Sequence, residues 1–342
     1  MRPAAGRARE MKDQTATRAV VGTVENGTSR TAADIATTMA AAPGRTSNPS
    51  AVEGRRRRYR PFVVERRVEV APGVAVHAVE HPGERQPFLL VHGLASNLRL
   101  WDGVAEGLAA AGHRVVSVDL RGHGRSDRPD DGYDVATVAS DLATLIGALD
   151  LGRPWAAGQS WGGNVVLELA WAAPEVVSGI ACVDGGWIEL ADRFPDWAAC
   201  ERQLRPPATT GLSSVLLEQR LRDSHPGWPE TGIQGVLACF EVRDDDTVAP
   251  WLTLERHLLI LRGLWQHRPS SRYPEVRVPV LLLPARREGG PDTGTEAAVA
   301  AAQEALAVSR TTWVEGDHDL HAQHPDLVAD ALLAAAVELT AT

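Results

Sequence analysis

The sequence has few of the residues that mark several large protein classes. Its three cysteines, Cys182, Cys200 and Cys239, show no Cys-x-x-Cys spacing, so we expect neither a disulfide framework nor a zinc site. No apolar run approaches the roughly 18 residues that a membrane-spanning helix needs. The first residues do not have the charged-then-apolar layout of a secretory signal. We therefore expect a soluble, cytoplasmic protein with no membrane partner.

Basic residues are also in the minority. Asp and Glu number 44 against 35 Lys and Arg, which gives a net charge of -9, and Lys12 is the single lysine. This balance provides no overall positive field for nucleic acid, so we expect no nucleic-acid partner. The run Arg55–Arg58 could contact acidic surfaces, but we interpret it as part of a solvated tail.

Large apolar residues are nearly absent from residues 1–60, which are rich in Ala, Thr, Arg, Gly and Ser. Such a segment cannot bury enough surface to offset its ordering entropy, so we predict a disordered tail there. The remainder divides into a core at residues 61–186 and 269–342 and an insertion at residues 187–268. This division rests on where the alternation of strands and helices is interrupted.

Apolar patterns from residue 62 onward alternate between strand and helix. Alternating residues predict a hairpin at 64–70 and 74–79, and short apolar runs predict buried strands at 88–91, 115–118, 154–157, 180–183, 280–283 and 311–314. Helical spacing covers residues 101–111, 135–149, 163–173, 292–308 and 325–339. The order predicts an α/β fold: a mostly parallel eight-stranded sheet with helices on both faces.

The insertion contains helical stretches at 212–222 and 252–265 and no convincing buried strand. A group of helices between two sheet strands would lie as a cap over the carboxyl edge of the sheet, where open α/β sheets bind ligands. Five tryptophans fall in or beside it: Trp187, Trp197, Trp228, Trp251 and Trp265. They suggest either an apolar or aromatic substrate or simply the core of the cap.

The strongest chemical signal is the pentapeptide Gly158-Gln159-Ser160-Trp161-Gly162, which follows an apolar strand and begins a helix. This is the context of the G-x-S-x-G nucleophile elbow, in which a sharp turn exposes the serine hydroxyl. The glycines let strand and helix approach closely. We therefore predict Ser160 as a nucleophile.

A serine hydroxyl needs a base to take its proton. His318 follows a short turn after the last predicted strand, which would bring it to the same sheet edge as Ser160. His321 and His324 are alternatives, although a solvated or helix-capping position would also explain them. We predict His318 as the general base.

The base in turn needs a carboxylate to hold its tautomer. Glu288 lies shortly after the strand at 280–283, and Asp184 closes the strand at 180–183. We predict Glu288 as the acid and keep Asp184 as the alternative. Glu288 could instead form a surface ion pair with Arg286 or Arg287, and Asp292 is explained by a helix cap.

Two backbone amides should form the oxyanion hole. The residue after the nucleophile, Trp161, supplies one, and the loop His92-Gly93-Leu94-Ala95-Ser96 after the strand at 88–91 supplies the other, from Leu94. Gly93 would let the backbone turn so that the Leu94 amide points into the site.

Four motifs in this order make the chain resemble the α/β-hydrolase superfamily over residues 62–339. They are the His92-Gly93 loop, the loop Asp119–Ser126, the elbow and the turn Gly316-Asp317-His318. The resemblance implies the fold, a cap over the site and the roles given above, and it implies that the Asp119–Ser126 loop is a turn held by side-chain hydrogen bonds. The sequence departs from the superfamily after the strand at 280–283, where similar proteins have Gly, two residues and Asp. Here those positions hold Ala285 and Glu288.

The predicted reaction is hydrolysis of an ester, lactone or thioester of a small, apolar substrate through an acyl-enzyme, with no metal and no cofactor. Alternatives on the same fold are a carbon–carbon bond hydrolase of ring-cleavage products and a cofactor-free haloperoxidase. A non-catalytic binding protein is a further alternative, because a fold does not determine function.

Overall fold

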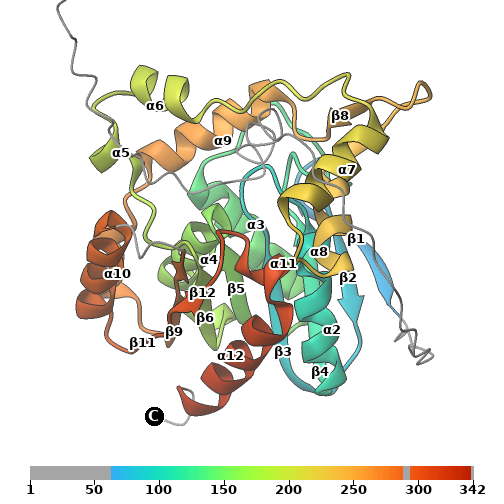
Figure 1. The fold of residues 1–342 in the computed structure, drawn as a ribbon. Helices are drawn as coiled ribbons and strands as arrows, with labels where there is room; N and C mark the ends of the chain where they lie inside the picture. The colour runs from blue at the N-terminus through green and yellow to red at the C-terminus, as the bar shows by residue number, and fades with distance from the viewer. Residues whose placement is uncertain (1–62, 288–292, 340–342) are drawn as a thin grey trace, which may run out of the picture.

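An eight-stranded sheet forms the centre of the computed structural model, which describes residues 63–287 and 293–339 (Figure 1). The strand order is β1-β2-β4-β3-β5-β6-β9-β11. The strands are β1 (Val64–Ala71), β2 (Val74–His81), β3 (Arg85–Val91), β4 (His113–Asp119), β5 (Trp155–Gln159), β6 (Gly179–Val183), β9 (Val280–Leu283) and β11 (Ser309–Thr311). β1 and β2 form the predicted hairpin, β2 pairs antiparallel with β4, and the other neighbours are parallel. The predicted tail at residues 1–60 lies outside the described residues.

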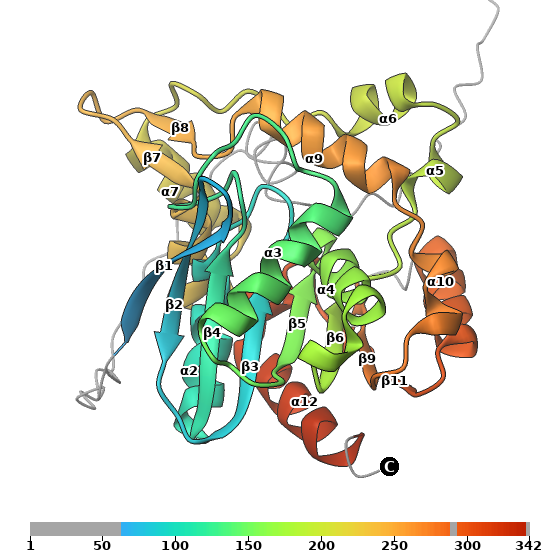
Figure 2. The ribbon, with the colours of Figure 1, turned by 180° about the vertical axis from the view of Figure 1, so that it is seen from behind.

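Helices cover both faces of this sheet. The main ones are α2 (Asp102–Ala110), α3 (Val135–Ala148), α4 (Trp161–Ala172), α10 (Thr293–Ala305), α11 (Leu320–Gln323) and α12 (Pro325–Glu338). α3 and α4 lie on one face (Figure 2), and α2 and α12 lie on the other (Figure 1). Every residue of β5, β6 and β9 is buried, as expected for strands covered on both sides. The predicted fold class is confirmed.

Two apolar layers hold the helices to the sheet. Leu142 of α3 and Val165 of α4 pack with one layer, whereas Leu108 of α2 and Leu332 of α12 pack with the other. All four side chains are at most 1% exposed. Burial of each side chain contributes about 1.5–3 kcal/mol to stability. The helices are therefore held firmly to the sheet, and the loops at its carboxyl edge start from fixed positions.

The segment between β6 and β9, most of which we predicted as a cap, contains five α-helices, one short hairpin and the 3-10 helices η3 (Pro269–Ser271) and η4 (Tyr273–Glu275). The α-helices and the hairpin strands are α5 (Leu190–Arg193), α6 (Trp197–Leu204), α7 (Ser214–Ser224), α8 (Glu230–Leu237), β7 (Phe240–Val242), β8 (Val248–Pro250) and α9 (Leu254–Gln266). α5, α6 and α9 lie above the sheet in Figure 1. Trp197 and Trp265 pack against each other, with ring centroids 6.3 Å apart, and both join a hydrophobic core. These contacts favour the packing role for these two cap tryptophans.

The last predicted strand is divided differently from expectation. Residues 309–311 form β11 at the sheet edge, whereas Val314–Glu315 form β12, which pairs with β10 (Ala285–Arg286) in a separate two-stranded sheet. The Val314 amide donates to the Pro284 carbonyl, so the segments that follow β9 and β11 stay paired beyond the ends of these two strands. This small sheet therefore leads the chain directly to His318.

Within the described ranges, no helix is both long enough and apolar enough to cross a membrane.

Candidate active site

Ser160 occupies the sharp turn between β5 and α4. Its backbone has φ 53° and ψ -121°, in a region that residues with a side chain rarely adopt. A Cβ atom on Gly158 would overlap the backbone of Gly162, so the close approach of strand and helix requires glycine there. Strain of this kind costs about 1–3 kcal/mol and is concentrated at functional sites.

The loop after β3 lies directly against this turn. A Cβ atom on Gly93 would come within 3.1 Å of the Ser160 Cβ. His92 holds the loop: its Nδ1–H donates to the Gly93 carbonyl at 2.7 Å, and its Nε2 accepts from the Leu120 amide at 3.0 Å. Burial lowers the pKa of His92 and outweighs the attraction of Asp119, so the ring is neutral. Its two hydrogen bonds keep the loop in place.

The two residues predicted to supply oxyanion amides flank the serine. Leu94 lines the small hollow that Ser160 faces. Trp161 is the first residue of α4, and the first amides of a helix have no acceptor within the helix. The roles of these two amides as oxyanion donors stay predictions.

His318 lies in the same hollow and is bonded to Asp184. Its Nδ1 lies 2.6 Å from Asp184 Oδ2, and the other oxygen of that carboxylate accepts from the Ala285 amide at 3.0 Å. Burial alone would lower the pKa of His318, but the hydrogen bond and charge of Asp184 raise it above its usual value. His318 Nε2 is buried and has no hydrogen-bond partner. Glu288, which we predicted as the acid, lies outside the described residues.

The two alternative histidines lie elsewhere. His321 is fully buried beside Trp101, with ring centroids 4.4 Å apart, and burial lowers its pKa to about 3. His324 precedes the first residue of α12 and makes no side-chain cap hydrogen bond. Neither of them lines the hollow at Ser160.

Comparison with known proteins supports the same fold. Residues 86–208 match the family described as alpha/beta hydrolase fold. An uncharacterized protein of Mycobacterium tuberculosis is 36% identical over 106 residues, which are 31% of this chain and 31% of that protein. The matched part is thus less than a third of that relative's length. A protein of Azorhizobium caulinodans named "Putative carbamate hydrolase RutD" is 28% identical over 73% of this chain and 91% of its own length.

Solved structures align over more of the chain. E-2-(acetamidomethylene)succinate hydrolase superposes with a TM-score of 0.68 at 22% identity, covering 80% of this chain and 99% of that one. A thioesterase domain from the curacin biosynthetic pathway gives 0.65 at 20% identity, with the same coverage of both chains. This chain is an α/β-hydrolase-fold protein.

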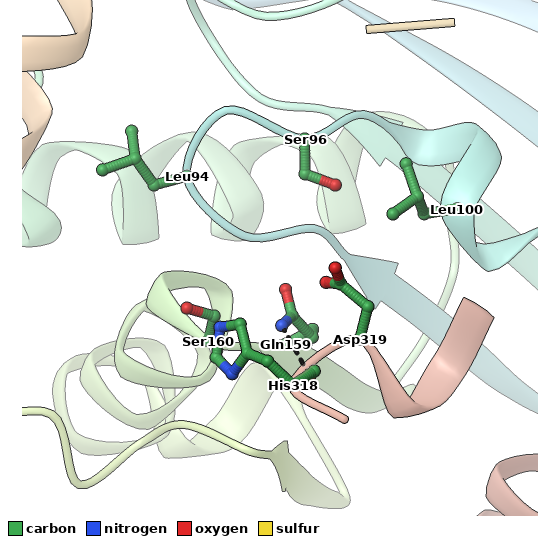
Figure 3. A pocket seen from close by; sticks show the side chains of 7 residues that line it. All are labelled: Leu94, Ser96, Leu100, Gln159, Ser160, His318 and Asp319. Carbon is green, nitrogen blue, oxygen red and sulfur yellow. Dashed lines mark hydrogen bonds between the residues drawn. The ribbon is translucent and has the colours of Figure 1, made fainter. Parts of the chain in front are cut away.

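Two sets of side chains near Ser160 and His318 were not assigned a role from the sequence. The Gln159 side chain donates from Nε2 to the His318 carbonyl at 3.1 Å and so joins the elbow to the histidine turn. Ser96, Leu100 and Asp319 line the hollow together with the residues above (Figure 3). Asp319 directly follows His318, and that adjacency was the available signal.

In the two described ranges, no group of three or more His, Cys, Asp or Glu side chains is arranged to hold a metal ion. The arrangement at Ser160 consists of a hydroxyl, an imidazole and a carboxylate, and these are the components of nucleophilic acyl transfer.

Proposed function

We propose that this chain is a serine hydrolase that cleaves an ester-like bond of a small substrate through an acyl-enzyme. The observation that carries the proposal is the 2.6 Å contact between His318 Nδ1 and Asp184 Oδ2, in the hollow that also holds Ser160. We assign Ser160 as nucleophile, His318 as general base and Asp184 as the acid. Asp184 takes the role first predicted for Glu288.

The hydrogen-bonding state of His318 supports its role as a base. Because the Asp184 carboxylate can only accept, Nδ1 carries the proton and Nε2 carries the lone pair. This Nε2 is buried and unpartnered, so it is available to take the Ser160 proton as the hydroxyl oxygen attacks the substrate carbonyl. The imidazolium that forms is then stabilised by the neighbouring carboxylate and returns the proton to the leaving group.

The tetrahedral intermediate needs donors for its oxyanion. We assign the amides of Leu94 and Trp161 to this role, and one such donor is worth about 3 kcal/mol in comparable sites. Water then attacks the acyl-enzyme by the same route, and His318 again takes a proton. An ester, lactone or thioester would meet these requirements, and the name of the similar thioesterase structure agrees with that range.

Labelling with a fluorophosphonate probe tests the proposal. We expect stoichiometric labelling of the native protein at Ser160, no labelling of Ser160→Ala and normal labelling of Ser270→Ala, which changes an exposed serine. Turnover of p-nitrophenyl esters should be lost in Ser160→Ala by about 10⁴-fold or more, without loss of the folded state. Undiminished ester cleavage by Ser160→Ala would remove the nucleophile assignment.

A further inference from the structure

The hollow at Ser160 contains two polar groups that the proposed mechanism does not use. Ser96 and Asp319 both line it, and each is 7% exposed. The Ser96 hydroxyl oxygen is buried and has no hydrogen-bond partner. In Figure 3 the Ser96 hydroxyl and the Asp319 carboxyl come from opposite walls and point toward the same space. Leu94 and Leu100 form the apolar sides.

The usual structural roles do not account for Asp319. It occupies the N-cap position of α11, yet its side chain makes no cap hydrogen bond. Across residues 63–287 and 293–339, its carboxyl takes part in no ion pair and accepts no side-chain or backbone hydrogen bond. A largely buried carboxyl without a partner among the described residues is costly, so a ligand that supplied a donor would stabilise it.

The surrounding charges select the kind of partner. Burial raises the pKa of Asp319 to about 6, the carboxylates of Asp184 and Asp317 act in the same direction, and His318 and Arg287 oppose them. Asp319 is therefore mainly ionised at neutral pH, and the carboxylates of Asp184 and Asp317 add to the negative charge near it. A cation or a strong hydrogen-bond donor would be attracted here, and an anion would be repelled.

We propose that Ser96 and Asp319 form a subsite for a primary or substituted amine carried by the substrate close to the bond that Ser160 cleaves. The ammonium group would donate to both oxygens, and Leu94 and Leu100 would contact its carbon chain. This inference rests on the proposed serine-hydrolase function and narrows its substrates to amino-substituted esters. It does not assign the amine to the acyl or the alcohol side.

Matched pairs of esters test the subsite and separate the two sides. On the acyl side, phenyl 4-(aminomethyl)benzoate is compared with phenyl 4-ethylbenzoate; on the alcohol side, 2-(dimethylamino)ethyl butanoate is compared with 3-methylbutyl butanoate, because none of these amines can form a stable amide with its own ester. The quantity is the ratio of kcat/KM for the amino ester to that for its neutral partner. We expect a ratio above ten on one side, which identifies where the amine lies. Ratios near one on both sides would overturn the subsite.

Three variants link the preference to these residues. Asp319→Asn should lower the ratio at least tenfold and Ser96→Ala about threefold, because a ratio cancels any general loss of catalysis. Asp317→Asn is the matched control, since Asp317 is exposed, does not line the hollow and belongs to the same turn. A ratio that Asp319→Asn leaves within twofold of the native value contradicts the proposal.

A measurement on the native protein covers the case in which Asp319→Asn does not fold. Propylammonium should protect Ser160 from the fluorophosphonate at concentrations where propanoate and propan-1-ol do not. Equal protection by all three compounds would overturn the amine subsite and leave the proposed function in place. Failure of the probe to label Ser160 at all would overturn the proposed function, and the subsite with it.

Discussion

Two buried polar clusters lie near each other in this chain and differ in how their hydrogen-bonding capacity is used. In the loop cluster, defined by Asp119, Arg121 and Asp141, the Asp119 carboxylate accepts from the His77 ring at 3.0 Å and from the Leu98 amide at 2.9 Å. Arg121 donates twice to Asp141, each time at 2.6 Å. Burial alone would raise the pKa of Asp119, but the hydrogen bonds from His77 and Leu98 help to hold this pKa below its usual value.

In the reaction cluster, defined by Ser160, His318, Ser96 and Asp319, several hydrogen-bonding groups have no partner. His318 Nε2 and the Ser96 hydroxyl are buried without partners, and the Asp319 carboxyl is unpaired among the described residues. Buried polar groups in proteins are normally satisfied, so an unsatisfied group calls for a specific explanation. The difference suggests that Asp119, Arg121 and Asp141 serve the fold and that the reaction cluster is kept open for a ligand. His77 Nε2 and His123 Nε2, next to the loop cluster, are also buried without partners, so the contrast concerns the three residues that define that cluster.

The largest expected effect separates Asp184 from Glu288. Asp184→Asn keeps the side-chain shape, but its amide cannot accept from His318 Nδ1, so the wrong tautomer is favoured. We expect kcat/KM for a neutral ester to fall about 10⁴-fold, as in comparable triads. Glu288→Gln, measured alongside, should change it by less than about threefold. If Glu288→Gln has the larger effect, the acid assignment returns to Glu288.

The next effect concerns stability and belongs to the loop cluster. Arg121→Ala leaves the Asp141 carboxylate buried and unpaired; both side chains of the pair are at most 5% exposed. The free energy of unfolding, measured with urea, should fall by about 3–5 kcal/mol. Ester turnover per folded molecule should change little. A fall below about 1 kcal/mol would mean that the two clusters do not differ as described.

Strain at the nucleophile predicts a smaller effect with a matched pair of variants. Ser160→Ala and Ser160→Gly both remove the hydroxyl, but only glycine adopts φ 53° without a steric penalty. We expect the glycine variant to be more stable than the alanine variant by about 1–2 kcal/mol in urea unfolding. Equal stability, or a more stable alanine variant, would show that the turn stores no strain.

The sheet and the strand-to-helix turn at Ser160 could be predicted from the sequence because both depend on local patterns, whereas the catalytic roles of Ser160, His318 and the loop after β3 stay predictions. The sequence could not decide between Asp184 and Glu288 because β6 and β9 are neighbours in the sheet. Residues that follow these two strands reach the same edge, so distance along the chain does not rank them. Only the geometry brings Asp184 Oδ2 to His318. The domain boundaries at residues 187 and 268 stay predictions.

Ser96 and Asp319 escaped sequence reasoning for a different reason. A serine in a loop and an aspartate before a short helix both have common structural explanations, in turns and in helix caps. What distinguishes them is the absence of the expected hydrogen bond, which only the folded chain reveals. Unsatisfied groups are a property of three-dimensional packing, and no local pattern encodes them.

The smallest expected effect is a shift in a pH profile. His318 must be neutral to act as a base, so kcat/KM for a neutral ester should rise with pH and reach half its maximum above pH 6.5, because the hydrogen bond and charge of Asp184 outweigh burial. In Asp184→Asn, burial and the Arg287 charge lower the pKa of His318, and only the weaker attraction of the Asp319 charge raises it. The residual activity should therefore reach half its maximum at a pH lower by about one unit or more. Asp319→Asn should move the midpoint in the same direction by less. An unmoved midpoint in Asp184→Asn would mean that this carboxylate does not stabilise the charged imidazole, and the contrast between the satisfied and the open cluster would lose its electrostatic basis.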